Sequence, residues 1–368
     1  MSAYGTKLAE GFSQKVMTQV YDKSLLESIV NRNFEGEING IGSKLNILDF
    51  DKISEQTYAN TTLTADVLTE NNGQLIIDTY KSFYWKEKTL AKWLSYIKNP
   101  HAYIVDQTAN ERAKNMETFA LAKYADVGAG NWVGTSNTTG TVTVDVTTGA
   151  VTGDGTSFTE AMEGRPFKAL GHTKWYRVKD YTSATAITIE DDLDDVDSVY
   201  SGAAIVAGAT FEIQCATVLS ITAANLLSKV AALKLALDKA EKNGYSTVPD
   251  TDRFLIVPPE FENVLVAATG VALHVPAVYD ELVKRGFITE LQGFKVFKSN
   301  RLSGNNTDGY YVLAGHSNWM TFAEKVLDAR MEEDLPGDFG TAYKDLFVYG
   351  AKVKDISRHQ AALGWWKF

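Results

Sequence analysis

Residues 71–83 read Asn-Asn-Gly-Gln-Leu-Ile-Ile-Asp-Thr-Tyr-Lys-Ser-Phe, and this stretch has the pattern of extended chain. Asn-Asn-Gly tolerates positive φ angles and predicts a turn, and the residues that follow, up to Tyr80, continue as a strand. Upstream, apolar residues alternate with polar ones in two further runs: Leu45 and Ile47, then Leu63, Ala65 and Val67. The sequence therefore predicts a long β-hairpin over residues 42–86.

This predicted hairpin lacks the material for a core of its own. It contains many threonines and few large apolar residues. An isolated hairpin of this kind is marginally stable in water. We therefore expect its stability to come from outside the segment, either from the rest of the chain or from another subunit.

Helical patterns flank the hairpin on both sides. Residues 1–41 form a polar arm in which apolar residues recur at helical spacing: Tyr21, Leu25, Leu26, Ile29 and Val30. After Pro100 a longer stripe predicts one long helix that ends near Gly128 and Gly130, and its members are Ala109, Ala113, Met116, Ala120 and Tyr124.

The remaining chain divides by composition. Residues 129–215 are rich in Thr, Gly, Val and Asp, and their short alternating runs predict a small all-β domain. In residues 216–368, Thr222 is a candidate N-cap for a helix that ends before Asn243 and Gly244. A further helix is predicted at residues 261–268, and strands are predicted at residues 253–257, 294–297, 310–313 and 346–353. The predicted fold class is therefore α+β.

Composition excludes several classes of protein. The chain has 368 residues, 45% of them hydrophobic, and a formal net charge of −10, so it is long enough for about two domains with buried cores. A pI near 5.1 argues against a protein that grips phosphates through a basic surface. The single cysteine, Cys215, has no intramolecular disulfide partner. We find no signal peptide or membrane-spanning apolar run, so we expect a soluble protein, made in a cytoplasm.

Motifs for metal or cofactor binding are weak. The glycine-rich residues 128–134 follow a predicted helix rather than a strand, which favours a linker over a phosphate loop. The acidic residues 190–197 lack the glycine and the distal glutamate of a calcium loop, and the five histidines are scattered. We therefore expect no cofactor, no metal and no catalytic residues.

One alternative is an α/β hydrolase. Residues 315–319, Gly-His-Ser-Asn-Trp, follow an apolar strand and begin like a nucleophile elbow, and Ser317 is followed in the chain by Asp328 and His359. However, Trp319 stands where the sharp turn requires glycine, and the upstream sequence predicts no parallel sheet. A strand-to-helix turn is the favoured interpretation.

The order of these segments resembles the major capsid proteins of tailed double-stranded DNA bacteriophages with the Hong Kong 97 fold. Gly-Ser-Lys-Leu-Asn-Ile at 42–47 and Leu-Ile-Ile-Asp-Thr-Tyr-Lys-Ser-Phe at 75–83 resemble the extended loop, and residues 111–124 resemble the spine helix. Three later segments are similar to the axial domain of the gene 5 coat protein subgroup: Ile-Thr-Ala-Ala-Asn at 221–225, Arg-Phe-Leu-Ile-Val-Pro-Pro at 253–259 and Gly-Phe-Lys-Val-Phe-Lys-Ser-Asn at 293–300.

The resemblance implies a division of the chain. It assigns residues 1–41 to an N-terminal arm, 42–86 to the extended loop, 87–128 to the peripheral domain with its spine helix, and 216–368 to the axial domain and the return to the peripheral domain. Residues 129–215 depart from the family pattern and resemble an inserted immunoglobulin-like β-sandwich.

The resemblance also implies function and partners. The protein would assemble with copies of itself, as hexamers and pentamers, into an icosahedral shell that encloses DNA without sequence-specific binding. A scaffolding protein, a portal and decoration or head-completion proteins are the implied partners, without membrane contact. The implied location is the virion, after assembly in the host cytoplasm. Some members cross-link lysine to asparagine; Lys44, Lys52 and Asn60 offer these residue types, but we assign them no such chemistry.

The main rival is a tail or surface adhesin. In that hypothesis residues 129–215 bind a ligand through Trp175, Tyr176 and Tyr181, although these aromatics equally suit a domain core.

The segment 129–215 has 12 acidic and 5 basic side chains, a net charge of −7, which leaves a net charge of −3 for the rest of the chain. Because such a domain would crowd packaged DNA, we expect it on the outside of a shell, where like charges discourage particles from adhering.

Overall fold

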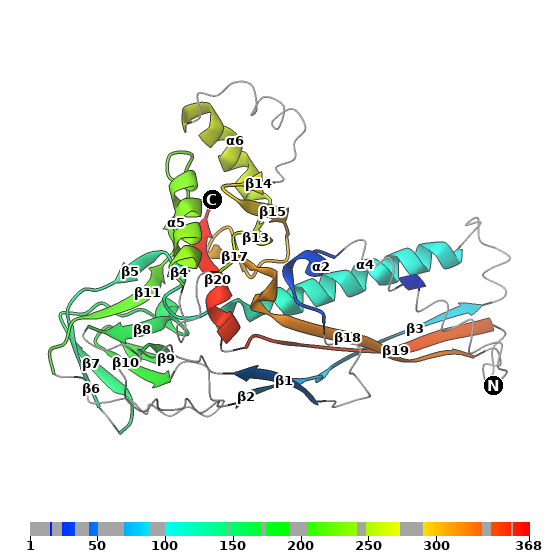
Figure 1. The fold of residues 1–368 in the computed structure, drawn as a ribbon, viewed down its shortest axis with the longest axis horizontal. Coiled ribbons are helices and arrows are strands. Elements are labelled where there is room, and N and C mark those ends of the chain that lie inside the picture. The colour runs from blue at the N-terminus through cyan, green and yellow to red at the C-terminus, as the bar shows by residue number, and fades with distance from the viewer. Residues whose placement is uncertain are drawn as a thin grey trace, which may run out of the picture. The chain divides into compact units, whose positions relative to one another are not determined.

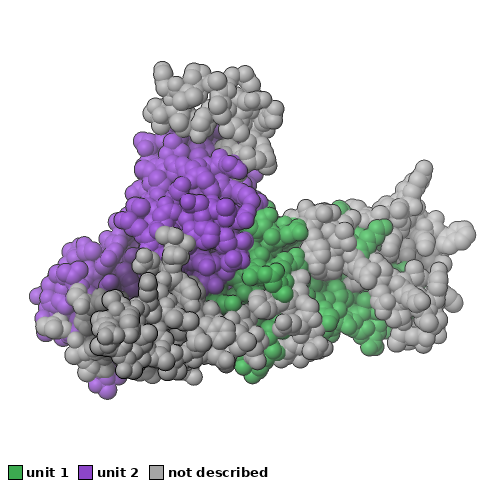
Figure 2. All heavy atoms as spheres, viewed as in Figure 1, with its two compact units in different colours: residues 1–120, 320–354 green, residues 121–319, 355–368 purple. Residues whose placement is uncertain are grey.

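The structure, a computed structural model, describes residues 15–16, 24–33, 44–50, 70–88, 100–145, 147–170, 174–191, 205, 207–240, 248–272, 290–332, 340–354 and 356–368. The chain divides into two compact units (Figure 2). Unit 1 consists of residues 1–120 and 320–354, and unit 2 consists of residues 121–319 and 355–368.

Unit 1 is built on a long helix and a three-stranded antiparallel sheet (Figure 1). The helix is α4 (Pro100–Leu121), and the strand order in the sheet is β18-β19-β3. These strands span Thr321–Glu332 (β18), Gly340–Lys352 (β19) and Thr79–Lys88 (β3). The sheet therefore joins the segment after the hairpin to a segment more than two hundred residues later.

The predicted long helix is confirmed from Pro100 onward, but it ends at Leu121, before the predicted end near Gly128. Pro100 opens α4, where a missing N–H has no cost because the first turn has no intrahelical acceptor for it. The predicted apolar stripe is buried at Ala109, Ala113, Met116 and Ala120. Tyr124 lies beyond the α-helix, in the 3-10 helix η2 (Ala122–Asp126).

The predicted hairpin is confirmed, but its turn is not at residues 71–73. Strand β1 (Lys44–Phe50) pairs antiparallel with β2 (Glu70–Ile76), and Phe50 is the register partner of Glu70. Gly73 lies inside β2 opposite Ile47, so the turn prediction is wrong. The strand register explains why residues 71–73 are extended, because this pairing places Leu45 directly opposite Leu75. The connection, residues 51–69, lies outside the described residues, as do Leu63, Ala65 and Val67.

The base of the hairpin has a core that the chain itself provides. Leu45, Leu75 and Ile77 are buried together with Ala323 of β18 and Val348 of β19. The first of the two expected sources of stability, the rest of the chain, therefore applies to this part of the hairpin.

Unit 2 contains a mixed eight-stranded sheet, called the axial sheet from here on. Its main path is β12-β20-β17-β13-β15-β14, with β4 paired to β20 and β16 paired to β17. The strands span Trp132–Val133 (β4), Leu219–Ser220 (β12), Arg253–Val257 (β13), Glu290–Leu291 (β14), Phe294–Lys298 (β15), Gly304–Asn305 (β16), Gly309–His316 (β17) and Ala361–Lys367 (β20). Helices α5 (Leu226–Asp238) and α6 (Glu260–Ala272) share the core of this sheet.

Helix α5 begins three residues after the position that the sequence suggested. The predicted N-cap Thr222 lies in a turn instead, where its backbone N–H donates to Asn225 Oδ1 over 2.8 Å. Asn225 is the N-cap residue, and its side chain also donates to the Ser220 carbonyl. The helix ends at Asp238, earlier than predicted, and its stripe of Leu226, Val230, Leu233 and Leu237 is fully buried.

The other sheet of unit 2, whose segment is called the insertion from here on, is a single seven-stranded antiparallel sheet with the order β5-β11-β8-β9-β10-β7-β6. The strands span Thr135–Asn137 (β5), Thr141–Val144 (β6), Ala150–Asp154 (β7), Pro166–Ala169 (β8), Tyr176–Ser183 (β9), Ala186–Asp191 (β10) and Phe211–Thr217 (β11). An isolated bridge joins Val142 of β6 to Ala209, just before β11, so the sheet curls back on itself. The all-β prediction is confirmed, whereas the immunoglobulin-like sandwich of two sheets is not.

Candidate assembly surfaces

One face of the three-stranded sheet is fastened to α4 by a buried ion pair. Arg112 of α4 bonds Asp345 of β19, and these side chains are only 9% and 2% exposed. The Arg112 guanidinium also lies 5.1 Å from the ring centroid of Phe83 and 4.8 Å from that of Phe347. Because both charges are desolvated, loss of either side chain would leave the other with a weaker compensation for its burial.

The alternate side chains of the same strands surround an open hollow of about 550 Å³. Two ion pairs line this hollow: Arg330 Nε lies 2.6 Å from Asp328 Oδ2, and Lys344 bonds Glu332. Tyr84 is 60% exposed at the same place. A shallow lining of paired charges and an exposed aromatic ring suits contact with another protein surface.

A short part of the polar arm is anchored within unit 1. The backbone N–H of Leu25 donates to Glu117 Oε1 of α4 over 2.9 Å, and Leu26 and Ile29 of helix α2 (Leu26–Ile29) are buried. Asn31 forms a bridge with Thr321 at the start of β18. Arg32 bonds the buried carboxylate of Glu324. The predicted amphipathic stretch therefore buries its apolar side in the same subunit, while Tyr21 lies outside the described residues.

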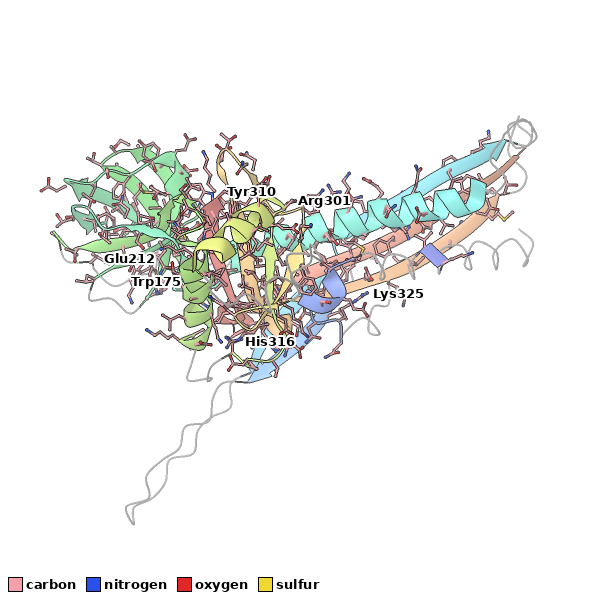
Figure 3. The ribbon with its side chains drawn as sticks, turned by 90° about the horizontal axis from the view of Figure 1, so that it is seen from above. Trp175, Glu212, Arg301, Tyr310, His316 and Lys325 are labelled. Carbon is pink, nitrogen blue, oxygen red and sulfur yellow. The ribbon has the colours of Figure 1, made fainter. Side chains whose placement is uncertain are left out.

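A second hollow, of about 520 Å³, lies in unit 2 beside α5. Trp175 and His359 line it together with Leu235, which is 51% exposed, and Figure 3 shows Trp175 beside α5. Of the three aromatics that the adhesin hypothesis needs, Tyr176 is 1% exposed in the insertion core and Tyr181 packs against that core. Tyr176 and Tyr181 therefore belong to the domain core, which was the alternative to ligand binding for these aromatic residues.

The Ser317 site does not have the geometry of a nucleophile elbow. Strand β17, which leads into the 3-10 helix η4 (Ser317–Trp319), is antiparallel to both neighbours, β13 and β20, whereas a nucleophile elbow follows a strand of a parallel sheet. Asp328 forms an ion pair with Arg330 in β18. The His359 ring packs against Gly128, where an added Cβ would lie 2.7 Å from Nδ1.

We expect Ser317→Ala to leave any trace of esterase turnover unchanged. The mutation would remove a hydroxyl from a turn that lacks the supporting geometry, so the nitrophenyl acetate background should equal that of the wild type. A loss of turnover in the variant with normal folding would revive the hydrolase hypothesis.

The linker prediction for residues 128–134 is confirmed only for residues 128–131, because Trp132 and Val133 form strand β4 and pair with β20. Gly128 N–H donates to the Arg358 carbonyl, and Gly130, at φ +95°, donates to Gln214 Oε1. Within the described residues, no group of three or more His, Cys, Asp or Glu side chains could hold a metal ion. Of the acidic residues 190–197 the structure describes only Glu190 and Asp191, each in an ion pair with a lysine, and Lys52 and Asn60 fall outside the described residues.

Burial controls the chemistry of two further groups. Burial raises the pKa of the Cys215 thiol to about 12, so this side chain is an inert core residue. Burial also lowers the pKa of His316, which therefore favours the neutral imidazole.

The sequence analysis did not predict the buried ion pair between Arg112 and Asp345 inside unit 1. For Arg112 a signal existed, because it lies three residues after Ala109 on the otherwise apolar stripe of the long helix. A charge in such a stripe indicates a buried partner. Asp345 carried no comparable signal, since β19 mixes charged and apolar residues on both faces.

In the part of the chain that the structure describes, no helix is long and apolar enough to cross a membrane. A sequence model of the phage capsid protein family matches residues 168–363, which is more than half of the chain. No curated protein matches the sequence.

Several solved structures share the fold at low sequence identity. The capsid of Cyanophage P-SCSP1u is similar with a TM-score of 0.52 and 14% identity, over 93% of this chain and 88% of that one. The mature capsid of bacteriophage PhiM1 gives 0.51 and 10%, over 93% and 87%. A structure from Mycobacterium phage Che8 gives 0.50 and 15%, over 93% and 90%.

Proposed function

Because this chain belongs to the phage capsid protein family, and is a structural major capsid protein with the Hong Kong 97 fold, we propose that its copies close into an icosahedral shell of hexamers and pentamers around double-stranded DNA. The observation that carries this proposal is the capsid fold over 93% of the chain together with the family match. Assembly into a shell of copies of itself and location in the virion follow from the family; hexamers, pentamers and enclosed DNA are the proposed detail.

The extended loop is the proposed contact between copies. Its base, strands β1 and β2, is packed into its own subunit through Leu45 and Leu75. The 51–69 connection would lie across a neighbouring subunit, and the hollow lined by Tyr84 and the β18–β19 ion pairs is a suitable surface for it. Repetition of one such contact in closed symmetry would bury a large total area.

Charge supports enclosure of DNA without a tight grip. The 281 residues outside the insertion carry a net charge of −3, while the insertion carries −7. A nearly neutral wall avoids strong attraction to phosphates and leaves packaged DNA free of sequence-specific contacts.

We further propose the partners and the absence of catalysis that the family resemblance implies. The subunit would assemble in the host cytoplasm with a scaffolding protein, join a portal, and accept decoration or head-completion proteins. It would act as a structural protein, not as an enzyme.

The division of the chain into five parts, with boundaries after residues 41, 86, 128 and 215, also remains a proposal. We place the start of the insertion sheet at Thr135, because Trp132 and Val133 pair with β20.

Electron microscopy of the purified protein tests the proposed function. Expressed alone or together with its scaffolding protein, the chain should form closed shells tens of nanometres across. Persistent monomers or small rings under both conditions would contradict the shell and favour an adhesin.

We predict that the insertion occupies the outer face of the shell. Intact, DNA-filled particles treated with protease should be cut within the insertion, and a matched sample of disrupted particles should give the same fragments at a similar rate. Protection in intact particles followed by cleavage after disruption would place the insertion on the inside.

A further inference from the structure

Unit 2 contains two separate hydrophobic cores. One lies in the insertion and includes Phe167, Tyr176 and Phe211. The other lies between the axial sheet and helices α5 and α6, and includes Leu233, Phe261 and Trp366. Two bodies with separate cores can move independently unless specific contacts join them. The side chains at their junction therefore decide whether the insertion is hinged or fixed.

Arg165 of the insertion enters an aromatic cluster of the axial sheet. Its guanidinium carbon lies 5.4, 5.2 and 4.3 Å from the ring centroids of Trp132, Tyr311 and Trp365, which belong to β4, β17 and β20. Its Nη2 donates to the Tyr311 hydroxyl over 2.9 Å, and its Nε donates to the Ala161 carbonyl over 3.2 Å. One side chain thus contacts three strands of the other body.

The Arg165 guanidinium is buried, and no described carboxylate forms an ion pair with it. Arg165 is 4% exposed, and among the described residues it has no acidic partner within ion-pair distance. The ring faces of the cluster offset its desolvation instead, since cation–π attraction strengthens when water is excluded. A planar guanidinium can stack on rings and donate hydrogen bonds at once, which a lysine ammonium cannot do.

Neighbouring contacts extend the cluster. Tyr124 of η2 stacks on Tyr311 with ring centroids 4.1 Å apart, and burial raises the pKa of Tyr124 to about 12. Arg177 of β9 lies over Trp132 and donates to the carbonyls of Gly164 and Val127. The junction is therefore a continuous layer of rings and guanidinium groups.

We propose that Arg165 is a positioning residue that locks the insertion to the axial sheet, so that the two bodies move as one and every copy presents the insertion in a single orientation. The insertion is then an integral part of the shell wall and not a tethered appendage. The coupling is a property of one subunit, so its test does not depend on shell formation.

Hydrogen exchange of the full-length subunit tests the coupling. In the wild type, amides of β8 and β9 should open together with those of β17 and β20. Arg165→Leu should speed exchange in β8 and β9 by about a hundredfold, as expected for loss of desolvated cation–π and charge-assisted contacts, and should leave β17 and β20 nearly unchanged. Equal acceleration in all four strands, or a change below about threefold, would overturn the proposal.

Milder variants keep the test decisive if Arg165→Leu fails to fold. Arg165→Lys keeps the charge but not the planar stack, and Tyr311→Phe removes only the hydroxyl; each should speed exchange in β8 and β9 by about tenfold. The matched control is Lys179→Leu, which removes an exposed positive charge from the same insertion and should have no effect. Acceleration by the control equal to that of Arg165→Lys would also overturn the proposal.

A distance measurement tests orientation directly. Spin labels at Thr152→Cys in β7 and Asn263→Cys in α6 would report the separation of the two bodies, because both positions are exposed and Cys215 is buried. The wild-type background should give one narrow distance distribution, and Arg165→Lys a broader one. A broad distribution in the wild-type background would show a hinged insertion and refute the lock.

Discussion

Replacing residues 51–69 with the dipeptide Asn-Gly is expected to give a subunit that folds normally and forms no stable shells. Because Phe50 pairs with Glu70, a two-residue connection closes this hairpin with the turn that antiparallel strands favour. The core at Leu45, Leu75 and Ile77 stays intact. The variant should unfold in urea at the wild-type midpoint, whereas electron microscopy should show no closed particles at concentrations that assemble the wild type.

Leu75→Ala is the matched comparison for this loop replacement. It leaves residues 51–69 in place but creates a cavity in the hairpin base, so it should lower the free energy of unfolding by about 2–5 kcal/mol. The two variants separate the folding role of the base from the assembly role of the connection. If the Asn-Gly variant loses stability as Leu75→Ala does, the connection belongs to the core of the subunit, and the proposed contact with a neighbour is wrong.

Arg112→Leu is expected to destabilise the subunit by about 3–5 kcal/mol, because the buried carboxylate of Asp345 would lose its ion pair with Arg112. The loss should appear in urea unfolding of the free subunit as a lower midpoint with an unchanged slope. Fewer folded subunits would then be available, so the yield of shells should fall with it.

Two further variants define the origin of this effect. Lys114→Met removes an exposed lysine whose ion pair with Glu111 spans 3.1 Å on the same helix, and should change stability by less than about 0.5 kcal/mol. The double variant Arg112→Leu with Asp345→Leu should recover most of the loss, since it removes both buried charges. A double variant as unstable as Arg112→Leu alone would show that the cation–π contacts with Phe83 and Phe347 dominate instead.

The sequence predicted elements where local pattern and tertiary packing agree. Strand β13 is fully buried and coincides with the predicted apolar run, and the α5 stripe at Leu226, Val230, Leu233 and Leu237 is buried as expected. In contrast, Asn-Asn-Gly at 71–73 has strong turn propensity, yet it forms a strand because cross-strand register outweighs local preference there.

The junction residues could not be predicted because their partners are distant in sequence. Arg165 precedes a short strand in a polar segment, where an arginine is normally exposed. Its burial depends on Trp132, Tyr311 and Trp365, which reach it only when the axial sheet brings β4, β17 and β20 together. No local period marks such a contact.

The curled sheet of the insertion has a consequence for colloidal behaviour. An open sheet exposes unpaired backbone groups at its outer strands, and these recruit strands from other molecules. Here the bridge between Val142 and Ala209 occupies part of one end of the strand order, and β5 at the other end has only three residues. Many copies on one particle give these domains a high local concentration. Because the insertion sheet has little unpaired strand edge, we expect its copies to resist edge-to-edge polymerisation.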